Sequence, residues 1–494
     1  MRQPRGEPRR QQLPPPGRSP WYPLIIILTV YAGLSLYQIN LPGLHYDEAF
    51  EAVPALQLLL GQPTTTFRSS GMMLGGQLFP LMTQDYIGAI NTYLAIPFIA
   101  MLGARPAALR VMSILVGATT IWLTYLLSYW LTGERRVGLV AALLLAVDPT
   151  FIFWNRQGIF VTAITATIGL AAAVSWLRRR QTGTIGWSVA GALFLGLGLY
   201  AKFLFIWLIA AFIGAVLLLN VARLRSPDMA RLNTLRHGKL EITLVGLAFI
   251  GGCWPLLVYN FQTGGTWLNI SQNALTSYYG VNNLAFGSNL LERIRQFGVL
   301  LSGSHLWYLG KIITNPLPPI IFGFILLGGV FVIILATRNN FALSANATLP
   351  VFSRLPRPQP AKVALFPFLV IGLTVLFSIG TVSALWLTHF ALLIPWPALA
   401  IALGGWYIYH ALRLLGFGSP TKLNAAAWLG VALLVATNLL TVMRYHQALT
   451  ESGGLSGHSD AIYDLSDWLA QHTTGEVVAM DWGLSAPVTY LTGR

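Results

Sequence analysis

Two adjacent carboxylates, Asp47 and Glu48, stand in the segment LHYDEAF that follows the first apolar stretch of the chain. Adjacent carboxylates repel each other and lose hydration when partly buried, so this placement needs a reason. One interpretation is a helix from Glu48 to Leu60, because the N-terminal end of a helix dipole favours acidic residues. The other is catalytic: the two carboxylates are a general base and its partner at a cavity mouth.

Few other acids are placed to join this pair. After the acids next to basic clusters and those of the C-terminal segment are set aside, the candidates are Asp47, Glu48, Glu51, Asp85, Asp148 and Glu292. Asp85 is either the N-cap of a following helix or a cavity residue, and we expect Tyr46 and Tyr86 beside it on the acceptor side.

Two of these acids have simpler interpretations. Asp148 precedes Pro149 at the end of an apolar stretch, which is typical of a turn residue. Glu292 lies beside Arg293 and Arg295, and this pattern predicts a solvated amphipathic helix.

The complementary cations start with Lys202, which interrupts a nearly continuous apolar run over 185–220. A lysine so placed either extends its amine to the membrane interface or pairs with an anion, for which a lipid phosphate is the natural candidate. We expect Arg110, Arg156 and His389 at the same outer face, although a lone histidine is more often a hydrogen-bonded core residue than a ligand. No Walker-type or dinucleotide glycine fingerprint follows a strand, which argues against a nucleotide site.

Composition decides the class of protein that must position these groups. The chain has 494 residues, of which 55% are hydrophobic and 10% charged, whereas a soluble domain has roughly 25% charged residues. This excludes a cytosolic enzyme and a nucleic-acid-binding domain. The 31 Lys and Arg against 16 Asp and Glu suit the cytoplasmic loops of a membrane protein. The single cysteine, Cys253, excludes an intramolecular disulfide and a thiolate zinc site.

The basic clusters predict a topology. Residues 1–20 form a basic tail, which we place in the cytoplasm, and the first apolar stretch at 22–40 is long enough to span a bilayer. The later basic clusters all fall on one side only if the stretch 86–103 does not cross, so we predict a re-entrant or interface helix there. The chain then makes about eleven crossings, with its N-terminus inside and its C-terminus outside the cell membrane.

The fold class is therefore an all-α polytopic membrane protein. A membrane domain at 21–445 carries two large outer segments, a first loop at 41–108 with interface helices and a second at 261–316. The segment 446–494 is acidic, with a helical pattern at 460–469 and a possible short buried strand, EVVAMD, at 476–481. One such αβ unit cannot bury its own apolar face, so it packs on the membrane domain, or the natural chain continues past Arg494.

Several motifs recur in a characteristic order. An acidic pair follows the first helix, LRV at 109–111 opens another, and a GERRVGL turn spans 133–139. Asn155-Arg156 then follows the Asp148-Pro149 turn, and YAK ends at Lys202. Together these resemble the polytopic glycosyltransferases of the C-type fold, over roughly residues 20–445. Among these, the chain resembles the dolichyl-phosphate-mannose–protein mannosyltransferases and the aminoarabinose transferases of lipid A.

The resemblance implies transfer of a sugar from a polyprenyl-phosphate donor to a protein, lipid or polysaccharide acceptor at the extracytoplasmic face. Asp47 would be the catalytic base, and Glu48 would orient the acceptor or the base. Lys202 would bind the donor phosphate together with Arg156 or Arg110, and the helix that carries His389 would approach the donor. Val161-Thr162 stand where the mannosyltransferases have an acid, and Phe50 where the aminoarabinose enzymes have an arginine. These departures concern the sugar and the acceptor. No cofactor is required, and a divalent metal is not expected, although the acidic pair could hold one.

Other functions fit parts of the pattern. The same charges would line the translocation path of a transporter or lipid flippase, although no internal repeat is evident. A structural subunit with a degenerate site and a transferase of whole lipid-linked oligosaccharides are further alternatives.

Overall fold

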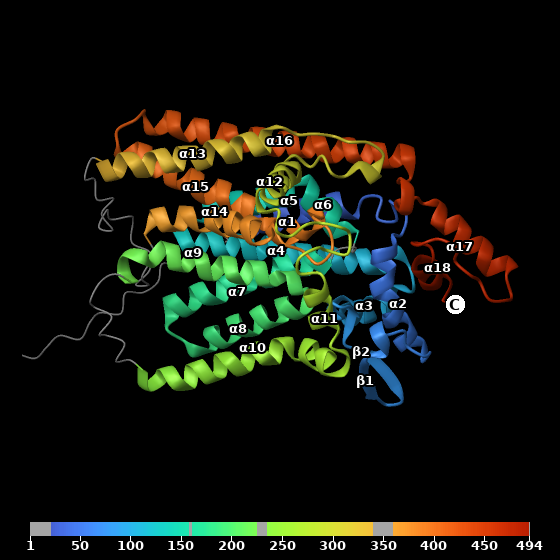
Figure 1. Cartoon of the computed structure of the whole chain (residues 1–494). Coiled ribbons are helices and arrows are strands. Elements are labelled where there is room, and N and C mark those ends of the chain that lie inside the picture. Colours follow the sequence, from blue (N-terminus) through green and yellow to red (C-terminus); the bar gives the residue numbers. More distant parts are fainter. Residues whose placement is uncertain (1–20, 158–160, 225–234, 339–358, 494) are drawn as a thin grey trace, which may run out of the picture.

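The computed structural model describes residues 21–157, 161–224, 235–338 and 359–493. The basic tail at 1–20 and parts of the basic segments at 223–239 and 338–362 lie outside the described residues. Most of the described chain forms a bundle of helices that run between two ends of the molecule (Figure 1). The bundle helices are α1 (Tyr22–Leu36), α4 (Pro106–Thr132), α5 (Arg135–Ala146), α6 (Pro149–Arg156), α7 (Val161–Thr182), α8 (Ile185–Ala201), α9 (Ile206–Leu224), α10 (Leu235–Thr263), α13 (Leu317–Arg338), α14 (Pro360–Phe377), α15 (Pro395–Leu414) and α16 (Pro420–Ser452).

The protein is a multi-pass membrane protein. Six of the described helices are long and apolar enough to cross a bilayer, or up to eight if each of two bent helix pairs is one span. The number of eleven crossings and the orientation of the termini remain predictions. Helix α4 is the central helix, with 67% of its most apolar window buried, whereas this share is 17–22% in α10, α13 and α16. The exposed sides of α10, α13 and α16 are therefore apolar, as expected for helices that contact the hydrocarbon core of a bilayer.

One bent pair explains a residue noted in the sequence. Helices α5 and α6 meet at an angle of 62°, and Asp148 lies at the break. Its carboxylate accepts a hydrogen bond of 2.8 Å from the backbone N–H of Phe151 and so caps α6. The prediction of a turn residue rather than a catalyst is confirmed.

One end of the bundle carries most of the connecting structure, and we call it the loop end (Figure 1). Its helices are α2 (Tyr46–Leu60), α3 (Ile90–Leu102), α11 (Gly265–Gln272), α12 (Phe286–Ser302), α17 (Ala461–His472) and α18 (Ser485–Thr492), with the short 3-10 turns η1 (Phe67–Ser69), η4 (Trp307–Leu309), η5 (Leu387–Leu393) and η6 (Ser456–His458). Helix α3 has 13 residues, about 20 Å at 1.5 Å per residue, which is too short for a core of about 30 Å. That 86–103 does not cross the membrane remains a prediction.

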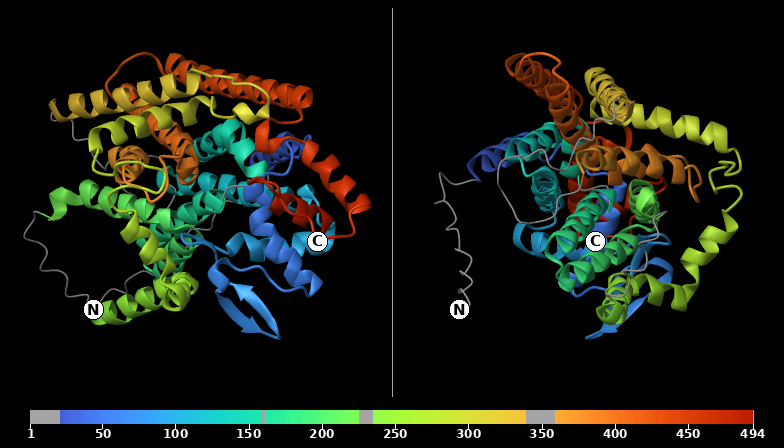
Figure 2. Two further views of the ribbon diagram at one scale, coloured as in Figure 1. Left: turned by 45° about the vertical axis from the view of Figure 1, so that its right-hand side comes forward. Right: turned by 90° about the vertical axis from the view of Figure 1, so that its left-hand side faces the viewer.

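Two short antiparallel hairpins in the first loop were not predicted. Strands β1 (Gly71–Leu74) and β2 (Gln77–Pro80) pair with Leu74 opposite Gln77. Strands β3 (Met82–Gln84) and β4 (Ile87–Gly88) form the second hairpin. The β1–β2 hairpin projects away from the bundle, whereas β3–β4 packs beside it (Figure 2). Strands of two to four residues leave too weak an alternation to be read from the sequence.

The C-terminal segment packs on the loop end, but its predicted strand is wrong. Residues 476–481 form no strand, and Met480 is 92% exposed. A lone strand needs a neighbouring strand to pair its backbone groups, and none lies beside this segment. Instead, α17 and α18 bury Ile462, Ala486 and Tyr490 in one apolar cluster with α2 and α3.

Basic side chains gather at the opposite end, which we call the basic end. Arg135 begins α5, Arg178–Arg180 end α7, and Lys362 lies in the first turn of α14. An ion pair and a hydrogen-bond contact tie helices together there. Arg179 binds Glu241 of α10 at 2.7 Å, and Glu134 contacts His410 of α15 at 3.0 Å. This gathering agrees with the one-sided distribution on which the predicted topology rests.

Candidate active site at the loop end

A cavity of about 910 Å³ opens at the loop end of the bundle. Its walls come from the first loop, α6, the break after α8, the segment 269–308, η5 and the C-terminal segment. The volume is in the range of small-molecule sites. The cavity contains most of the residues predicted from the sequence: Tyr46, Asp47, Asp85, Tyr86, Lys202 and His389.

The acidic wall is the first turn and a half of α2. His45 caps this helix, because its Nδ1 accepts a hydrogen bond of 3.2 Å from the backbone N–H of Asp47. The side chain of Asp47 is 46% exposed and faces the cavity. The helix predicted from Glu48 to Leu60 is present as Tyr46–Leu60. The acidic residues in its first turn therefore favour the helix dipole, and Asp47 also lines the cavity.

Glu51 is a second acid of the cavity to which the sequence analysis gave no role. It lies four residues after Asp47 and so on the same face of α2. Its Oε2 is buried and has no hydrogen-bond partner among the described residues. Burial raises the pKa of Glu51 to about 8, although Asn91 beside it acts in the opposite direction. The helical spacing from Asp47 is the signal that could have identified it.

Lys202 lies in the break between α8 and the 3-10 turn η2 (Phe203–Phe205). Ile87 of β4 forms an antiparallel bridge with Lys202, and the N–H of Phe203 donates to the carbonyl of Tyr86 at 2.8 Å. The first-loop hairpin β3–β4 thus holds the lysine backbone directly. Gly88 permits this contact, since a Cβ there would lie 2.3 Å from the carbonyl oxygen of Tyr200.

The ammonium group of Lys202 forms no hydrogen bond or ion pair within the part of the chain that the structure describes. Burial lowers the pKa of Lys202 to about 8, while Glu51 and Asp47 act to raise it. The ammonium group of Lys202 can therefore donate hydrogen bonds to a ligand, and it lies in the same cavity as the carboxyl groups of Asp47 and Glu51 on α2. Such a group is suited to an anionic ligand.

Asp85 lines the cavity, but its oxygens are already engaged. Arg68 donates two hydrogen bonds to it at 2.7 and 2.8 Å, and the hydroxyl of Tyr259 donates a third at 2.5 Å. Burial would raise the pKa of Asp85, yet these bonds and one from Asn269 hold it below its usual value. The N-cap interpretation is wrong, because α3 begins after Ala89. Asp85 instead ties the first loop to α10 and α11.

Three other predicted residues are not brought into the cavity. Glu48 and Arg110 form a fully buried ion pair, with N–O distances of 2.9 and 3.1 Å. Arg110 also donates to the carbonyls of Ile39 and Pro42 at 2.7 and 2.9 Å. These contacts contradict a role for Glu48 in orienting an acceptor and for Arg110 in binding a phosphate. A fully buried guanidinium needs several acceptors, and the loop after α1 supplies them.

Arg156 is also buried, and its Nη2 donates to the carbonyls of Tyr37 and Gln38, both at 2.6 Å. It therefore anchors the same loop as Arg110, and its predicted contact with a donor phosphate is not supported. The sequence could not distinguish these anchors from ligands, because carbonyl acceptors are supplied by any backbone.

His389 lines the cavity and is also part of the core, as its alternative interpretation allowed. Its Nδ1 lies 3.3 Å from Nη2 of Arg293. Arg293 is fully buried and donates to the carbonyl of Ser378 at 2.9 Å. The prediction of a solvated helix is therefore right only for its outer face, where Glu292 and Arg295 form an exposed pair at 2.6 Å. Arg295 lines the cavity as a cation that the sequence analysis did not select.

Aromatic rings complete the cavity wall. His458 stacks between His45 and Tyr308, with ring centroids 4.1 and 4.2 Å apart. Tyr46 lies 4.7 Å from the ring of Trp482. The first loop, the second outer segment and the C-terminal segment thus meet here and give an apolar surface beside the charged groups. Within the described residues, no group of three or more His, Cys, Asp and Glu side chains could hold a metal ion.

The sequence matches one family model, described as dolichyl-phosphate-mannose-protein mannosyltransferase, over residues 90–249. This match includes Lys202 but begins after Asp47. No curated protein matches the chain.

Solved structures share the fold over nearly the whole chain. The structure of ArnT from Cupriavidus metallidurans in the apo state has a TM-score of 0.58 at 12% identity, covering 95% of this chain and 84% of the other. The same protein bound to undecaprenyl phosphate has a TM-score of 0.53 at 13% identity, covering 96% and 85%. The archaeal oligosaccharyltransferase AglB from Archaeoglobus fulgidus, in complex with an inhibitory peptide and a dolichol-phosphate, has a TM-score of 0.52 at 12% identity and covers 96% and 64%. The C-type fold predicted from the sequence is therefore confirmed.

Proposed function

We propose that this chain is a membrane glycosyltransferase that moves a sugar from a polyprenyl-phosphate donor to an acceptor at the extracytoplasmic face. The observation that carries the proposal is one cavity that holds Asp47 and Lys202 together. The family model and the fold shared with ArnT and AglB support the same reaction class. The cavity lies at one end of the bundle, whereas a transporter binds its substrate near mid-depth.

The reaction is a single displacement. The Asp47 carboxylate takes the proton of an acceptor hydroxyl, whose oxygen forms a bond to the anomeric carbon of the sugar. The bond between that carbon and the phosphate oxygen breaks, and the polyprenyl phosphate leaves with the electron pair. One displacement inverts the anomeric configuration. Base catalysis of this kind contributes about 10²–10⁴-fold to the rate.

Lys202 stabilises the negative charge that grows on the leaving phosphate. Glu51 supports this role in its protonated form, since a neutral carboxyl beside Lys202 leaves the lysine charge available to the donor. Because burial lowers the pKa of Lys202 to about 8, we expect donor binding to weaken above that pH as the ammonium loses its proton. Glu48 and Arg110 are positioning residues, which fix α2 and the loop before it.

The test is a transfer assay with purified protein and a panel of radiolabelled polyprenyl-phosphate sugars, followed by loss of label from the lipid. We expect Asp47→Asn to lower turnover roughly 10²–10⁴-fold while donor binding is retained. Lys202→Ala should mainly raise the donor KM. The matched controls Asp464→Asn and Lys311→Ala change exposed residues outside the cavity and should leave transfer unchanged.

Each outcome has a defined meaning. Wild-type turnover by Asp47→Asn would remove Asp47 from the role of base. An unchanged donor KM in Lys202→Ala would argue against its contact with the phosphate. Label that stays on every donor of the panel would contradict the proposed reaction itself.

A further inference from the structure

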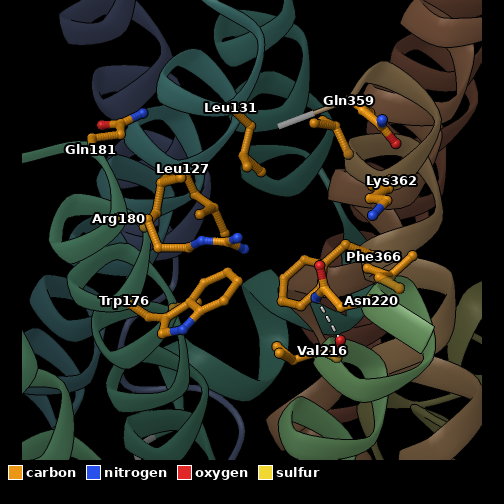
Figure 3. A pocket seen from close by; sticks show the side chains of 14 residues that line it. Leu127, Leu131, Trp176, Arg180, Gln181, Val216, Asn220, Gln359, Lys362 and Phe366 are labelled. Carbon is orange, nitrogen blue, oxygen red and sulfur yellow. Dashed lines mark hydrogen bonds between the residues drawn. The ribbon is translucent and has the colours of Figure 1, made fainter. Parts of the chain in front are cut away.

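A second hollow lies at the basic end of the bundle, away from the active-site cavity. It has a volume of about 260 Å³ and lies between α4, α7, α9 and α14 (Figure 3). Its apolar wall consists of Leu127, Leu131, Trp176, Val216 and Phe366, among others. Helix α8 starts at the basic end and finishes at Lys202, so its 17 residues, about 25 Å, separate this hollow from the proposed transfer reaction.

Two cations face this hollow from opposite sides. Figure 3 shows Arg180 extending from the last turn of α7 and Lys362 from the first turn of α14. The guanidinium carbon of Arg180 lies 4.9 Å from the ring centroid of Trp176, a cation–π contact that orients the arginine. The amide side chains of Gln181, Asn220 and Gln359 also line the hollow. Gln181 and Asn220 donate to the backbone carbonyls of Trp130 and Val216, at 3.0 and 2.7 Å. The charge at this end of the hollow therefore comes from Arg180 and Lys362, and a cationic site of this kind suits a phosphate group.

The other end of the hollow is apolar and continues into the bundle. An adjoining hollow of about 440 Å³ shares Ala173, Trp176, Val216 and Phe366 with it and extends between α7, α8, α9 and α10. Arg179 and Ser188 also line it and are both bonded to Glu241. The rest of its lining is apolar, with residues such as Leu195, Phe212 and Leu217. A charged mouth with an apolar extension matches an amphiphile rather than a free phosphate or a peptide.

The residues around the hollow indicate that the head group of this amphiphile is negatively charged and that the amphiphile comes from the membrane. Arg178 lies over the ring of Trp130 at 4.7 Å, and Arg135 and Arg136 begin α5 at the same end. Trp176 is 38% exposed, as tryptophans at a membrane interface commonly are. A basic, tryptophan-containing rim complements the anionic lipids of a bilayer surface.

We propose that this hollow binds an anionic phospholipid. Its phosphate lies between Arg180 and Lys362, and one acyl chain enters the apolar extension between α7 and α9. The site would tie α7 to α14, which contribute its two cations from separate parts of the sequence. It does not depend on the transfer reaction at the loop end.

The experiment measures binding of a phosphatidylglycerol with a photoreactive group in one acyl chain to the full-length protein in phosphatidylcholine nanodiscs. We expect saturable labelling, and labelled peptides from α7, α9 and α14. The double variant Arg180→Ala/Lys362→Ala should weaken binding roughly 30-fold, since each interfacial charge contributes about 1 kcal/mol and 1.4 kcal/mol is tenfold. Val216→Trp, which fills the hollow and keeps both charges, should also abolish labelling of α9.

The control variant Arg413→Ala/Lys422→Ala removes two exposed cations from helix ends outside the hollow, and it should bind as wild type does. If both double variants lost lipid binding equally, the loss would be explained by the lower surface charge alone, and the proposed site would be overturned. Unchanged labelling in Val216→Trp would also overturn it. Equal labelling by a photoreactive phosphatidylcholine would contradict the requirement for an anionic lipid. Retention of the wild-type melting temperature shows that a loss of binding is not a loss of folding.

Discussion

Lys202 shares its cavity with two carboxyl groups of α2 that differ in solvent access. Asp47 is partly exposed, as a base that meets an incoming acceptor must be, whereas Oε2 of Glu51 is buried without a partner. The two acids lie one helical turn apart, so a single helix places one carboxyl group at the cavity surface and the other in a buried position. Burial raises the pKa of Glu51 to about 8, so this acid retains its proton at neutral pH.

The protonation of Glu51 predicts a pH dependence of stability. Its pKa is raised from 4.5 to about 8 by burial. The stabilising contribution of the protonated form is complete below about pH 4.5 and is lost as the pH rises to about 8. Glu51→Gln removes this loss, so the variant should gain stability relative to wild type between pH 5 and 8, with no further gain above.

Thermal unfolding in detergent from pH 5 to 9 measures the difference in unfolding free energy between Glu51→Gln and wild type. Because one proton is involved, this difference changes by no more than roughly 1.4 kcal/mol per pH unit. Glu476→Gln, at an exposed position of the C-terminal segment, is the control and should show no such trend. A difference between Glu51→Gln and wild type that is the same at every pH would mean that Glu51 is ionised throughout.

Helix α2 owes its position to the buried pair of Glu48 and Arg110. The pair joins the first turn of α2 to α4 and to the backbone of the preceding loop. Breaking a buried ion pair on one side leaves an uncompensated charge and costs about 3–5 kcal/mol. We therefore expect Glu48→Gln to destabilise the protein strongly, and Glu48→Leu/Arg110→Met to recover part of the loss.

Denaturation of the detergent-solubilised variants checks this expectation. Glu292→Gln breaks the exposed pair with Arg295 and should cost no more than about 1 kcal/mol. A Glu48→Gln variant as stable as wild type but without transfer activity would return Glu48 to the reaction.

The same residues show how far the sequence could be interpreted. The helical bundle follows from its apolar stretches, and Asp47, Lys202 and His389 were correctly expected to share a pocket. The sequence does not tell which acid of the pair faces the cavity and which faces the core. That depends on how α2 is rotated about its own axis where it packs against α4. Arg110 and Arg156 looked like phosphate ligands, since a bond to a backbone carbonyl leaves no signature in the partner's residue type. The segment 476–481 has strand-like alternation but no neighbour to pair with.

The two ends of the bundle have opposite character, one basic and one built of loops that enclose the cavity. This asymmetry predicts that the basic end faces the cytoplasm and the loop end the outside. Single cysteines at Thr182 and Glu476, introduced after Cys253→Ser, report on the two ends, because both positions are exposed. An impermeant thiol reagent added to intact cells should label the Glu476→Cys variant and not the Thr182→Cys variant. Labelling of Thr182→Cys alone would reverse the topology.

The cavity wall joins His45, near the start of the chain, to Trp482, near its end. During synthesis on the ribosome, Asp47 and Lys202 are made before the C-terminal segment that supplies His458 and Trp482 to the cavity wall. The cavity is therefore complete only after the last span has been inserted. A translocation intermediate stalled before α17 should not react with lipid-linked sugars.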